Sequence, residues 1–329
     1  FYVARARRRV GTIICVHLSC KQCYMMPEKR LSLVIATYNR GAKLCTTLDS
    51  LLVQTLPQEQ WEVVVVNNNS TDDTAARFAD YVVAHPQLDA RMVLETEQGV
   101  SAARNRGIAE SRGEYIVVID DDERVVPEFL ERYYSLFESH PEVGAAGGRI
   151  LPGFESVPPR WMSKYTERTI AGTLDLGDRM REFPEGKFFG GGNHGYRRAV
   201  VGRYGGYDTS LGRTGGVLLA GEEKEFYGRL RAGGERIVYL PDAVIYHLVE
   251  PERLTRGYFV KLCRNIGRSE RRRTRTASRT AFAGRLAAEA VKWAGASVLA
   301  LGFLLQGTPA KGGYLLIMRW QITAGLLGA

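Results

Sequence analysis

Hydrophobic and polar positions alternate along the first half of the chain in two distinct ways. Short runs rich in Val, Ile and Leu predict buried strands, and longer stretches with apolar residues three and four positions apart predict helices. The strands are expected at residues 31–36, 61–66, 91–95 and 114–119, and the helices at residues 41–54, 74–84 and 101–111. This alternation favours an α/β fold whose mainly parallel central sheet is covered by helices on both faces.

The pattern is less regular after Pro127. A helix is expected at residues 128–139, a strand at 143–150 and another strand at 237–246, with a Pro- and Gly-rich connection between the two strands. In the first half, Ser70 to Asp73 read as a capping box that opens the helix at Thr74. No internal repeat is found before residue 251.

The last 79 residues change character. Residues 251–285 contain 11 Lys or Arg and 2 Asp or Glu, and residues 286–306 form an apolar run of about the length that crosses a bilayer. Because Glu289 and Lys292 interrupt that run, we expect helices that lie in the membrane interface or re-enter it, rather than a single span. A soluble helical subdomain is the alternative.

The net charge of +9 is unevenly distributed. Residues 31–250 hold 24 basic and 32 acidic residues, so this part of the chain is acidic and the excess positive charge lies at the two ends. An acidic body argues against nucleic-acid binding, whereas a basic segment beside apolar ones suits an anionic membrane surface. The five cysteines give no disulfide framework, and Cys20 and Cys23 form a C-x-x-C without the second ligand pair that structural zinc requires.

The first residues are expected to lie outside the fold. Arg7 to Arg9 followed by an apolar stretch resemble a signal peptide, but Met25 looks like a natural start, so residues 1–24 read as an upstream extension. A signal anchor is the alternative. We expect four regions: an extension (1–30), two halves of one α/β domain (31–125 and 126–250) and a helical tail (251–329).

Three polar clusters follow predicted strands where parallel strands bring their carboxyl ends together. The run "IDDDE", with Asp120, Asp121 and Asp122, follows the strand at 114–119, and the other clusters contain Thr37 to Arg40 and Asn67 to Ser70. Ligands of open α/β sheets bind at this edge. Carboxylates so close together repel one another and favour a bound cation or facing arginines, although an acidic solvated loop would also fit.

The order of the motifs resembles the inverting family 2 glycosyltransferases of GT-A fold over residues 31–250. The matching segments are "LSLVIATYNR", "VVVVNNNSTDDT", "GVSAARNRGIAESRGEYIVVIDDDE", "GGGNHGYRRAVVGRYGGYDTSL", "AGEEKEF" and "YLPDAVIYH". The resemblance implies a nucleotide-sugar-binding half (31–125), an acceptor-binding half (126–250), a nucleotide-diphosphate sugar as donor, with UDP favoured, and Mg²⁺ or Mn²⁺ as cofactor. The G-x-G-x-x-G at Gly190–Gly195 lies far from the first strand, and no acidic residue stands about 20 positions after it, so it is a poor dinucleotide fingerprint. It then reads as a glycine-rich turn on the acceptor side.

The resemblance also implies roles for individual residues. Asp122 and Asp120 would form the Asp-x-Asp pair, with Asp122 on the metal and Asp120 nearer the ribose, and His247 would either close the metal site or be a packed core histidine. The nucleotide would be bound by Arg104 of the helix predicted at residues 101–111 and by side chains after the first, second and fourth strands: Thr37, Tyr38, Arg40, Asn67, Asn69, Asp120 and Asp121. Asn67 stands where the family usually has an aspartate, so base binding is retained but uracil specificity is less secure. Alternatively, Arg104 would be an exposed arginine on the surface of its helix, with no role in binding the nucleotide.

Inverting transfer needs a general base for the acceptor hydroxyl. The family's Glu-Asp pair corresponds here to Glu222 and Glu223, with Glu223 in the position of the base and a solvated helix start as the alternative. Trp161 and His194 are expected in the acceptor pocket. The acceptor would be a glycan or a polyprenyl-linked sugar, and because sugar nucleotides are made in the cytosol, the enzyme would work at the cytoplasmic face of the plasma membrane.

Two other functions remain open from the sequence. A sugar-nucleotidyltransferase also uses a nucleotide, a metal and a parallel sheet, but residues 37–43 lack a glycine-rich triphosphate loop. A catalytically dead GT-A scaffold on a membrane would be favoured if the carboxylates were absent, and they are present.

Overall fold

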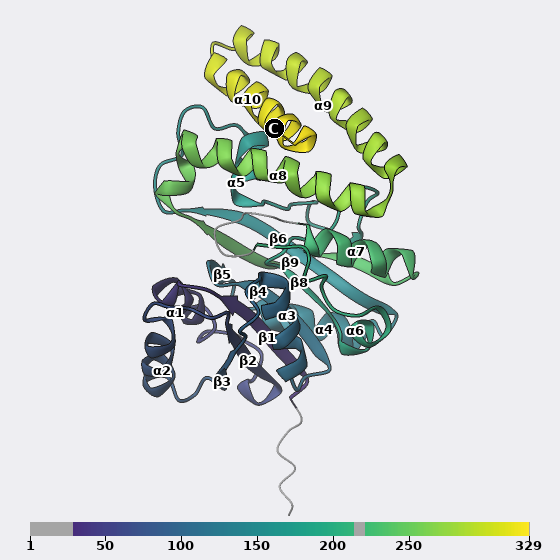
Figure 1. Cartoon of the computed structure of the whole chain (residues 1–329). Coiled ribbons are helices and arrows are strands. Elements are labelled where there is room, and N and C mark those ends of the chain that lie inside the picture. The colour runs from purple at the N-terminus through teal and green to yellow at the C-terminus, as the bar shows by residue number, and fades with distance from the viewer. Residues whose placement is uncertain (1–28, 214–220, 329) are drawn as a thin grey trace, which may run out of the picture.

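A single curved sheet organises the chain, and three long helices cover one side of it (Figure 1). The computed structural model describes residues 29–213 and 221–328. In this part the sheet order is β3-β2-β1-β4-β8-β6-β9-β5, with β7 paired to β9. The strands are β1 (Leu31–Thr37), β2 (Trp61–Asn67), β3 (Ala90–Leu94), β4 (Tyr115–Asp120), β5 (Glu123–Val125), β6 (Val143–Phe154), β7 (Arg181–Glu182), β8 (His194–Arg197) and β9 (Arg236–Val249).

Helices connect these strands in the order that the hydrophobic pattern predicts. Helix α3 packs on β1 and β2, and α4 packs on β4 and β9. The helices are α1 (Gly41–Asp49), α2 (Thr74–Ala84), α3 (Val100–Glu110), α4 (Phe129–Ser139), α5 (Lys164–Ala171), α6 (Arg198–Tyr204), α7 (Glu222–Ala232), α8 (Arg256–Ala277), α9 (Arg279–Leu305) and α10 (Pro309–Leu327), with 3₁₀ turns at Gln58–Gln60 and Pro251–Leu254.

The predicted α/β fold with a mainly parallel sheet is confirmed. Strands β3, β2, β1 and β4 are parallel neighbours, with Leu31 opposite Trp61 and Tyr115 in the register. The second half of the sheet is mixed, because the short strand β8 runs antiparallel to both β4 and β6. The sequence did not indicate β8, since a strand of four residues that directly follows a glycine run has almost no periodicity of its own.

Two local predictions differ from the structure. The helix expected at residues 41–54 ends at Asp49, and the side chain of Gln54 instead donates to the carbonyl oxygen of Val126 on the next layer. The helix at Thr74 begins as predicted but without a capping box: Oδ1 of Asp72 accepts the backbone N–H of Thr74, two residues on. A short acidic side chain can satisfy a helix start in either way.

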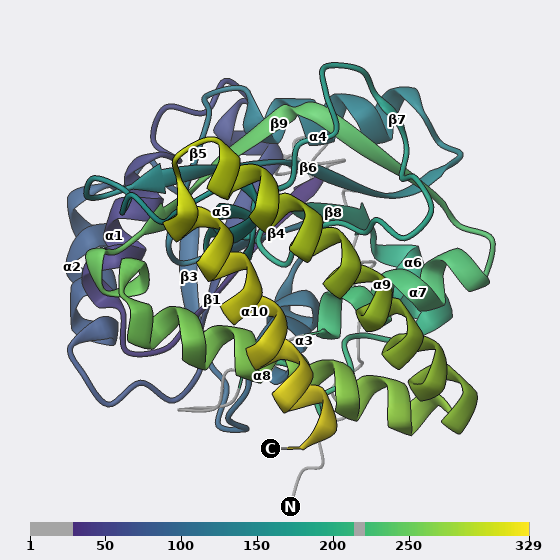
Figure 2. The same cartoon turned by 90° about the horizontal axis from the view of Figure 1, so that it is seen from above.

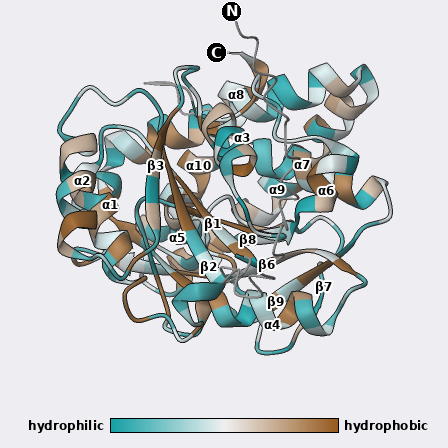
Figure 3. Cartoon of the chain, turned by 90° about the horizontal axis from the view of Figure 1, so that it is seen from below, coloured by the Kyte–Doolittle hydropathy of each residue, from teal (hydrophilic) through white to brown (hydrophobic). Residues whose placement is uncertain are grey.

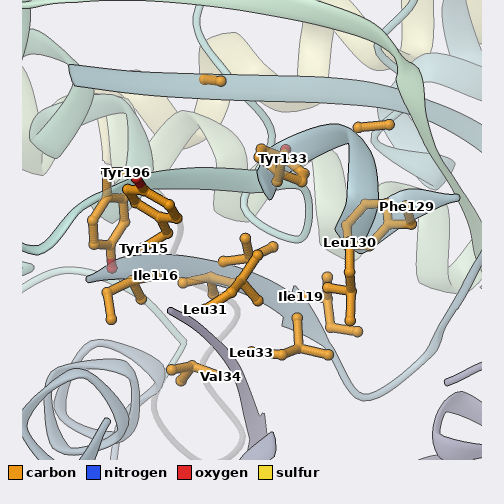
Figure 4. Packing of buried hydrophobic residues seen from close by; sticks show 14 of the residues in the cluster. Leu31, Leu33, Val34, Tyr115, Ile116, Ile119, Phe129, Leu130, Tyr133 and Tyr196 are labelled. Carbon is orange, nitrogen blue, oxygen red and sulfur yellow. The ribbon is translucent and has the colours of Figure 1, made fainter. Parts of the chain in front are cut away.

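The core lies between the central strands and the helices on the two faces. Strands β1 and β2 are almost wholly buried and appear mainly in the hydrophobic colour of Figure 3. Figure 4 shows Leu33 and Ile119 of the parallel strands beside Leu130 of α4, with Tyr133 nearer to β8. This one hydrophobic cluster extends from Leu31 to Ile245, so the two predicted halves of the domain share a core.

The three C-terminal helices form a separate layer, in which α9 and α10 lie side by side over α8 (Figure 2). Their own hydrophobic cluster includes Phe259, Leu315 and Ile322, and it also takes in Ile170 of α5. Among the described residues, α9 is the one helix whose length and apolar composition would allow it to cross a membrane. The helical tail expected after residue 251 is therefore present.

The charges that interrupt the apolar run of α9 are arranged in a way that the sequence did not indicate. Glu289 is only 2% exposed, and its carboxylate accepts hydrogen bonds from Arg285 (2.8 Å) and from Arg319 of α10 (3.1 Å). The opposite face of α9 leaves Val298 72% and Leu305 80% exposed. Glu289 thus points into the helical layer, and its charge does not break the outer apolar face.

Candidate active site

A cavity of about 350 Å³ opens at the carboxyl ends of β1 and β4, where the sequence placed the polar clusters. Its wall contains Thr37 and Tyr38 after β1, the acidic run after β4, and Glu222 and Glu223 at the start of α7. Residues of α5 and α8 also line the cavity, among them Ala171 and Tyr258. One cavity therefore brings together residues as far apart in the sequence as Thr37 and Tyr258.

Arg104 lies at the centre of the site. It is 2% exposed, and its guanidinium donates to Asp120 (2.7 Å), to Glu222 (3.0 Å) and to the carbonyl oxygen of Gly191 (2.9 Å). Burial alone would raise the pKa of Asp120, but the Arg104 charge outweighs it and lowers that pKa. The surface position that the sequence left open for Arg104 is excluded by this burial, and Arg104 connects the acidic run to the start of α7.

Asp121 and Asp122 face different partners. Asp121 accepts hydrogen bonds from Thr37 (2.7 Å) and Arg40 (2.9 Å), and burial raises its pKa to about 6. Asp122 accepts from Arg40 (2.8 Å) and Arg253 (2.7 Å), and its Oδ2 lies 3.6 Å from Nε2 of His247. Burial would raise the pKa of Asp122, but His247 and the two arginines lower it well below its usual range.

The donor set at Asp122 is compatible with a divalent cation only with help from a ligand. In residues 29–213 and 221–328, no group of three or more Asp, Glu, His or Cys is arranged to hold a metal. Asp122 and His247 offer an oxygen and a nitrogen of the kind Mn²⁺ accepts, and diphosphate oxygens would have to supply most of the others. Arg40 and Arg253 share the carboxylate of Asp122, so they are the side chains that a bound cation would displace.

Glu222 and Glu223 occupy the first turn of α7, but they are not the solvated helix start that the sequence left open as an alternative. Glu222 is 6% exposed and is held by Arg104, whereas Glu223 is half-buried and faces the cavity. Burial and the neighbouring Glu222 raise the pKa of Glu223 to about 8. A carboxyl group with a pKa near the working pH is suited to accept and release a proton.

The glycine run forms part of the cavity wall. A Cβ atom at Gly192 would lie 1.8 Å from Oε1 of Glu123, so only glycine lets the backbone pass this close. Glu123 accepts the backbone N–H of Asp120 (3.0 Å) and fixes the turn that presents the aspartates. The G-x-G-x-x-G is therefore a packing feature of this site, in line with the glycine-rich turn expected from the sequence.

Several residues named from the sequence lie outside the cavity wall. Asn67 Oδ1 accepts the N–H of Ser70, and Asn69 adopts a positive φ of 63° in the same turn. Trp161 stacks on Tyr314 of α10 with ring centroids 4.1 Å apart, so it belongs to the tail core instead of the acceptor pocket. His194 is also a core residue: it is fully buried, it contacts Gly190 and Tyr207, and burial lowers its pKa to about 3.

Other residues in the cavity wall were not among those expected to bind the nucleotide. Asn68 lines the cavity in place of Asn67, because successive residues at the end of β2 point to opposite sides. Gln98 and Arg213 also line it, and Arg253 reaches Asp122 from the turn that precedes α8. Asn68 lies within a quoted family segment, but Gln98, Arg213 and Arg253 belong to none of those segments, so only the arrangement of loops in space could reveal these three residues.

Comparison with known proteins agrees with this geometry. The family model described as Glycosyl transferase family 2 matches residues 32–205, more than half of the chain. The chain belongs to that family, and it is a glycosyltransferase of GT-A fold.

Two curated relatives each align with 66% or more of this chain. The chain is 28% identical over 233 residues to a glucosyl-dolichyl phosphate glucuronosyltransferase of Haloferax volcanii, which covers 66% of this chain and 69% of the relative. It is 26% identical over 245 residues to the succinoglycan biosynthesis protein ExoM of Rhizobium meliloti, with 72% of this chain and 73% of that protein covered.

Solved structures show the same fold at lower identity. The mannosyltransferase PcManGT of Pyrobaculum calidifontis, in complex with GDP-Man and Mn²⁺, has a TM-score of 0.58 at 19% identity, covering 89% of this chain and 87% of its own. GalNAc-T7 with UDP, GalNAc and Mn²⁺ has a TM-score of 0.53 at 15% identity, covering 73% of this chain and 47% of its own. These similarities extend to the fold alone.

Proposed function

We propose that this glycosyltransferase moves a sugar, with inversion, from a nucleotide-diphosphate donor to the hydroxyl of a glycan or lipid-linked acceptor. The observation that carries the proposal is the position of Glu223, a half-buried carboxyl group in the same cavity wall as the aspartates after β4. A sugar placed between them would have a proton acceptor on one side and the polar end of the sheet on the other.

Glu223 acts as the general base. Its carboxylate takes the proton of the acceptor hydroxyl while that oxygen forms a bond to the anomeric carbon, and the bond from that carbon to the diphosphate oxygen breaks. Arg104 holds Glu222 and Asp120 in fixed positions beside the reacting atoms through hydrogen bonds of 3.0 and 2.7 Å. Glu222 is thereby a positioning residue, since its carboxylate is already bound to Arg104.

The donor is bound at the ends of β1 and β4. Tyr38 is 38% exposed at the cavity and offers a ring face to the nucleobase of the donor. Arg40 and Arg213 supply positive charge for the diphosphate. Two structural neighbours were solved with UDP or GDP-Man and Mn²⁺, which supports a nucleotide sugar with a divalent cation here; we favour UDP. Asp122 and His247 would hold the cation, which would neutralise charge on the leaving diphosphate.

The acceptor side and the tail support action at a membrane. One relative is named for an acceptor on dolichyl phosphate, and in this chain α9 carries an exposed apolar face while α8 exposes Arg268, Arg272 and Arg275. Apolar and basic surfaces together favour an anionic membrane, which we assign to the cytoplasmic face of the plasma membrane. The sugar-nucleotidyltransferase alternative loses support, because the relatives reported above are glycosyltransferases or polysaccharide-biosynthesis proteins.

A thermal-shift screen with UDP-, GDP- and dTDP-sugars, each with Mn²⁺ or with EDTA, tests the donor and the metal. A ligand at about one hundred times its Kd should stabilise the fold by ~2.7 kcal/mol. We expect the shift with a UDP-sugar and Mn²⁺, its loss in EDTA, and its loss in Asp122→Asn. Asp80→Asn, on the exposed surface of α2, is the matched control. An equal shift in EDTA would show that the donor binds without a metal.

A further inference from the structure

A second cavity, of about 240 Å³, adjoins the donor cavity. Gly172, Gly191 and Glu223 line both cavities, so the carboxyl group assigned as the base stands at the junction between them. An acceptor hydroxyl must reach the base from the side opposite to the leaving diphosphate. The second cavity is therefore placed to hold the acceptor, if the proposed transfer is correct.

The charges in this second cavity are strongly biased. Its wall contains two cationic side chains, Arg168 and Lys187, and one acidic side chain, Glu223. Burial and the proximity of Arg168 lower the pKa of Lys187, which places the two cations close to each other. Within residues 29–213 and 221–328 neither of them forms an ion pair with a carboxylate. Two neighbouring cations without a protein counterion favour an anionic ligand.

The cationic side of the cavity is joined to the C-terminal helices. Arg168 lies on α5, and the next residue, Thr169, has its Oγ1 3.2 Å from Sδ of Met318 on α10. Ile170 and Ala171 of the same helix belong to the hydrophobic cluster of the tail. An anionic group bound by Arg168 would thus lie next to the apolar helical layer, while the hydroxyl that reacts lies at Glu223.

From this arrangement we infer that the second cavity is an acceptor subsite for a sugar that carries a phosphate or diphosphate ester, with Arg168 and Lys187 binding the phosphate. A phosphate monoester or a diphosphate diester carries about two negative charges, which matches two adjacent cations better than the single charge of a uronate or of a phosphate diester. The phosphate ester can belong to a lipid carrier or to a soluble sugar phosphate, and the position of α5 against α10 favours the lipid carrier.

Binding of four probes to the full-length chain, saturated with UDP and Mn²⁺, tests the inference. The probes are phytanyl-diphosphate-linked glucose, glucose 1-phosphate, octyl glucoside and methyl glucuronide, each titrated by calorimetry at matched detergent concentration. We expect both phosphate probes to bind at least about tenfold more tightly than the neutral and carboxylate probes, the contribution of a charge-assisted hydrogen bond. A tighter Kd for the phytanyl probe than for glucose 1-phosphate would identify the lipid carrier as the source; the reverse would identify a soluble sugar phosphate.

Substitutions of the two cationic residues test whether they bind the phosphate group of the acceptor. Arg168→Ala and Lys187→Ala should each weaken the two phosphate probes by about tenfold and leave octyl glucoside unchanged, and Lys187→Arg should restore binding. Arg160→Ala, an exposed arginine outside the cavity wall, is the control. Phosphate binding that survives both alanine variants, or a preference for methyl glucuronide, would overturn the inference. If the wild-type chain did not bind UDP with Mn²⁺, that result would instead count against the proposed function. Failure of the acceptor-subsite inference can therefore be distinguished from failure of the proposed function.

Discussion

At the scale of single residues, the carboxyl groups of the candidate site differ in whether an arginine is paired with them. Arg104 forms ion pairs with Asp120 and Glu222, and Arg40 forms ion pairs with Asp121 and Asp122. Glu223 is the member of the cluster that combines a place in the cavity wall with a pKa raised to about 8. Its chemistry therefore gives the sharpest tests.

Replacing Glu223 with Gln keeps its size and hydrogen bonding but removes its ability to accept a proton. We expect kcat to fall by about 10²–10⁴-fold, with little change in the donor KM, since the base contacts the acceptor. Glu222→Gln is the matched control and should lower kcat less. Steady-state kinetics decide the matter: a Glu223→Gln enzyme that keeps more than about a tenth of wild-type turnover would refute the assignment.

The raised pKa of Glu223 also predicts a pH profile. A base must be deprotonated to work, so kcat/KM should rise about tenfold per pH unit below about pH 8 and level off above it. Glu222→Gln removes the neighbouring negative charge and should therefore shift the rising limb to lower pH. An unshifted limb in this variant would mean that Glu223 is not the group that titrates.

At the scale of elements, buried ion pairs fix the tail helices to one another and to α7. Glu270 of α8 accepts hydrogen bonds from Lys224 (2.9 Å), the residue after the proposed base, and from Arg285 of α9 (2.9 Å). Burial would raise the pKa of Glu270, but Arg273 and Lys224 lower it to about 2. The start of α7 is thus held by charge contacts with the helical layer, which links the position of Glu223 to that of the tail.

The strongest stability prediction concerns Glu289. Glu289→Ala would leave the inward-facing guanidinium groups of Arg285 and Arg319 without their shared carboxylate. Breaking a buried pair in this way should lower the free energy of unfolding by about 3–5 kcal/mol, measured by denaturant titration of the tryptophan signal. Lys292→Ala, an exposed change on the same helix, should cost less than about 0.5 kcal/mol. Equal effects of the two variants would contradict the inward orientation of Glu289.

At the scale of the whole molecule, the three C-terminal helices lie over the sheet (Figures 1 and 2). Residues of β1, β4 and α8 all line the candidate active-site cavity. The outward side of α9 exposes Val291, Val298 and Leu305. Deleting residues 286–329 would expose the α8 side of the tail core as well as remove α9, so surface substitutions make a cleaner test of membrane binding.

We expect the double variant Val298→Asp, Leu301→Asp to lose most of its binding to vesicles that contain anionic lipid, because both side chains are more than half exposed on α9. Flotation in a density gradient measures this. Val83→Asp, 82% exposed on α2, should float like the wild type. High salt should release part of the wild-type protein if the arginines of α8 contribute. A double variant that floats as well as the wild type would exclude α9 as the membrane face.

The sequence by itself determined the elements and the edge of the sheet where the site lies. Runs such as Leu31–Thr37 and Tyr115–Asp120 carry a local periodicity that depends on few other residues, and acidic residues directly after a buried strand must lie at its end. The order of these motifs was enough to identify the family. The resemblance to the family also indicated Glu222 and Glu223 as a pair, and both lie in the first turn of α7.

Only the tertiary structure decided which side chains meet. Arg104 and Glu222 are 118 residues apart, and Arg253 and Asp122 are 131 apart, so no local pattern could pair them. The same is true of Glu289, whose partner Arg319 shows that the charge faces inward. Local hydrophobic periodicity fixes helices and strands because it acts between near neighbours, whereas pairing of buried charges depends on the distances that the packed chain creates.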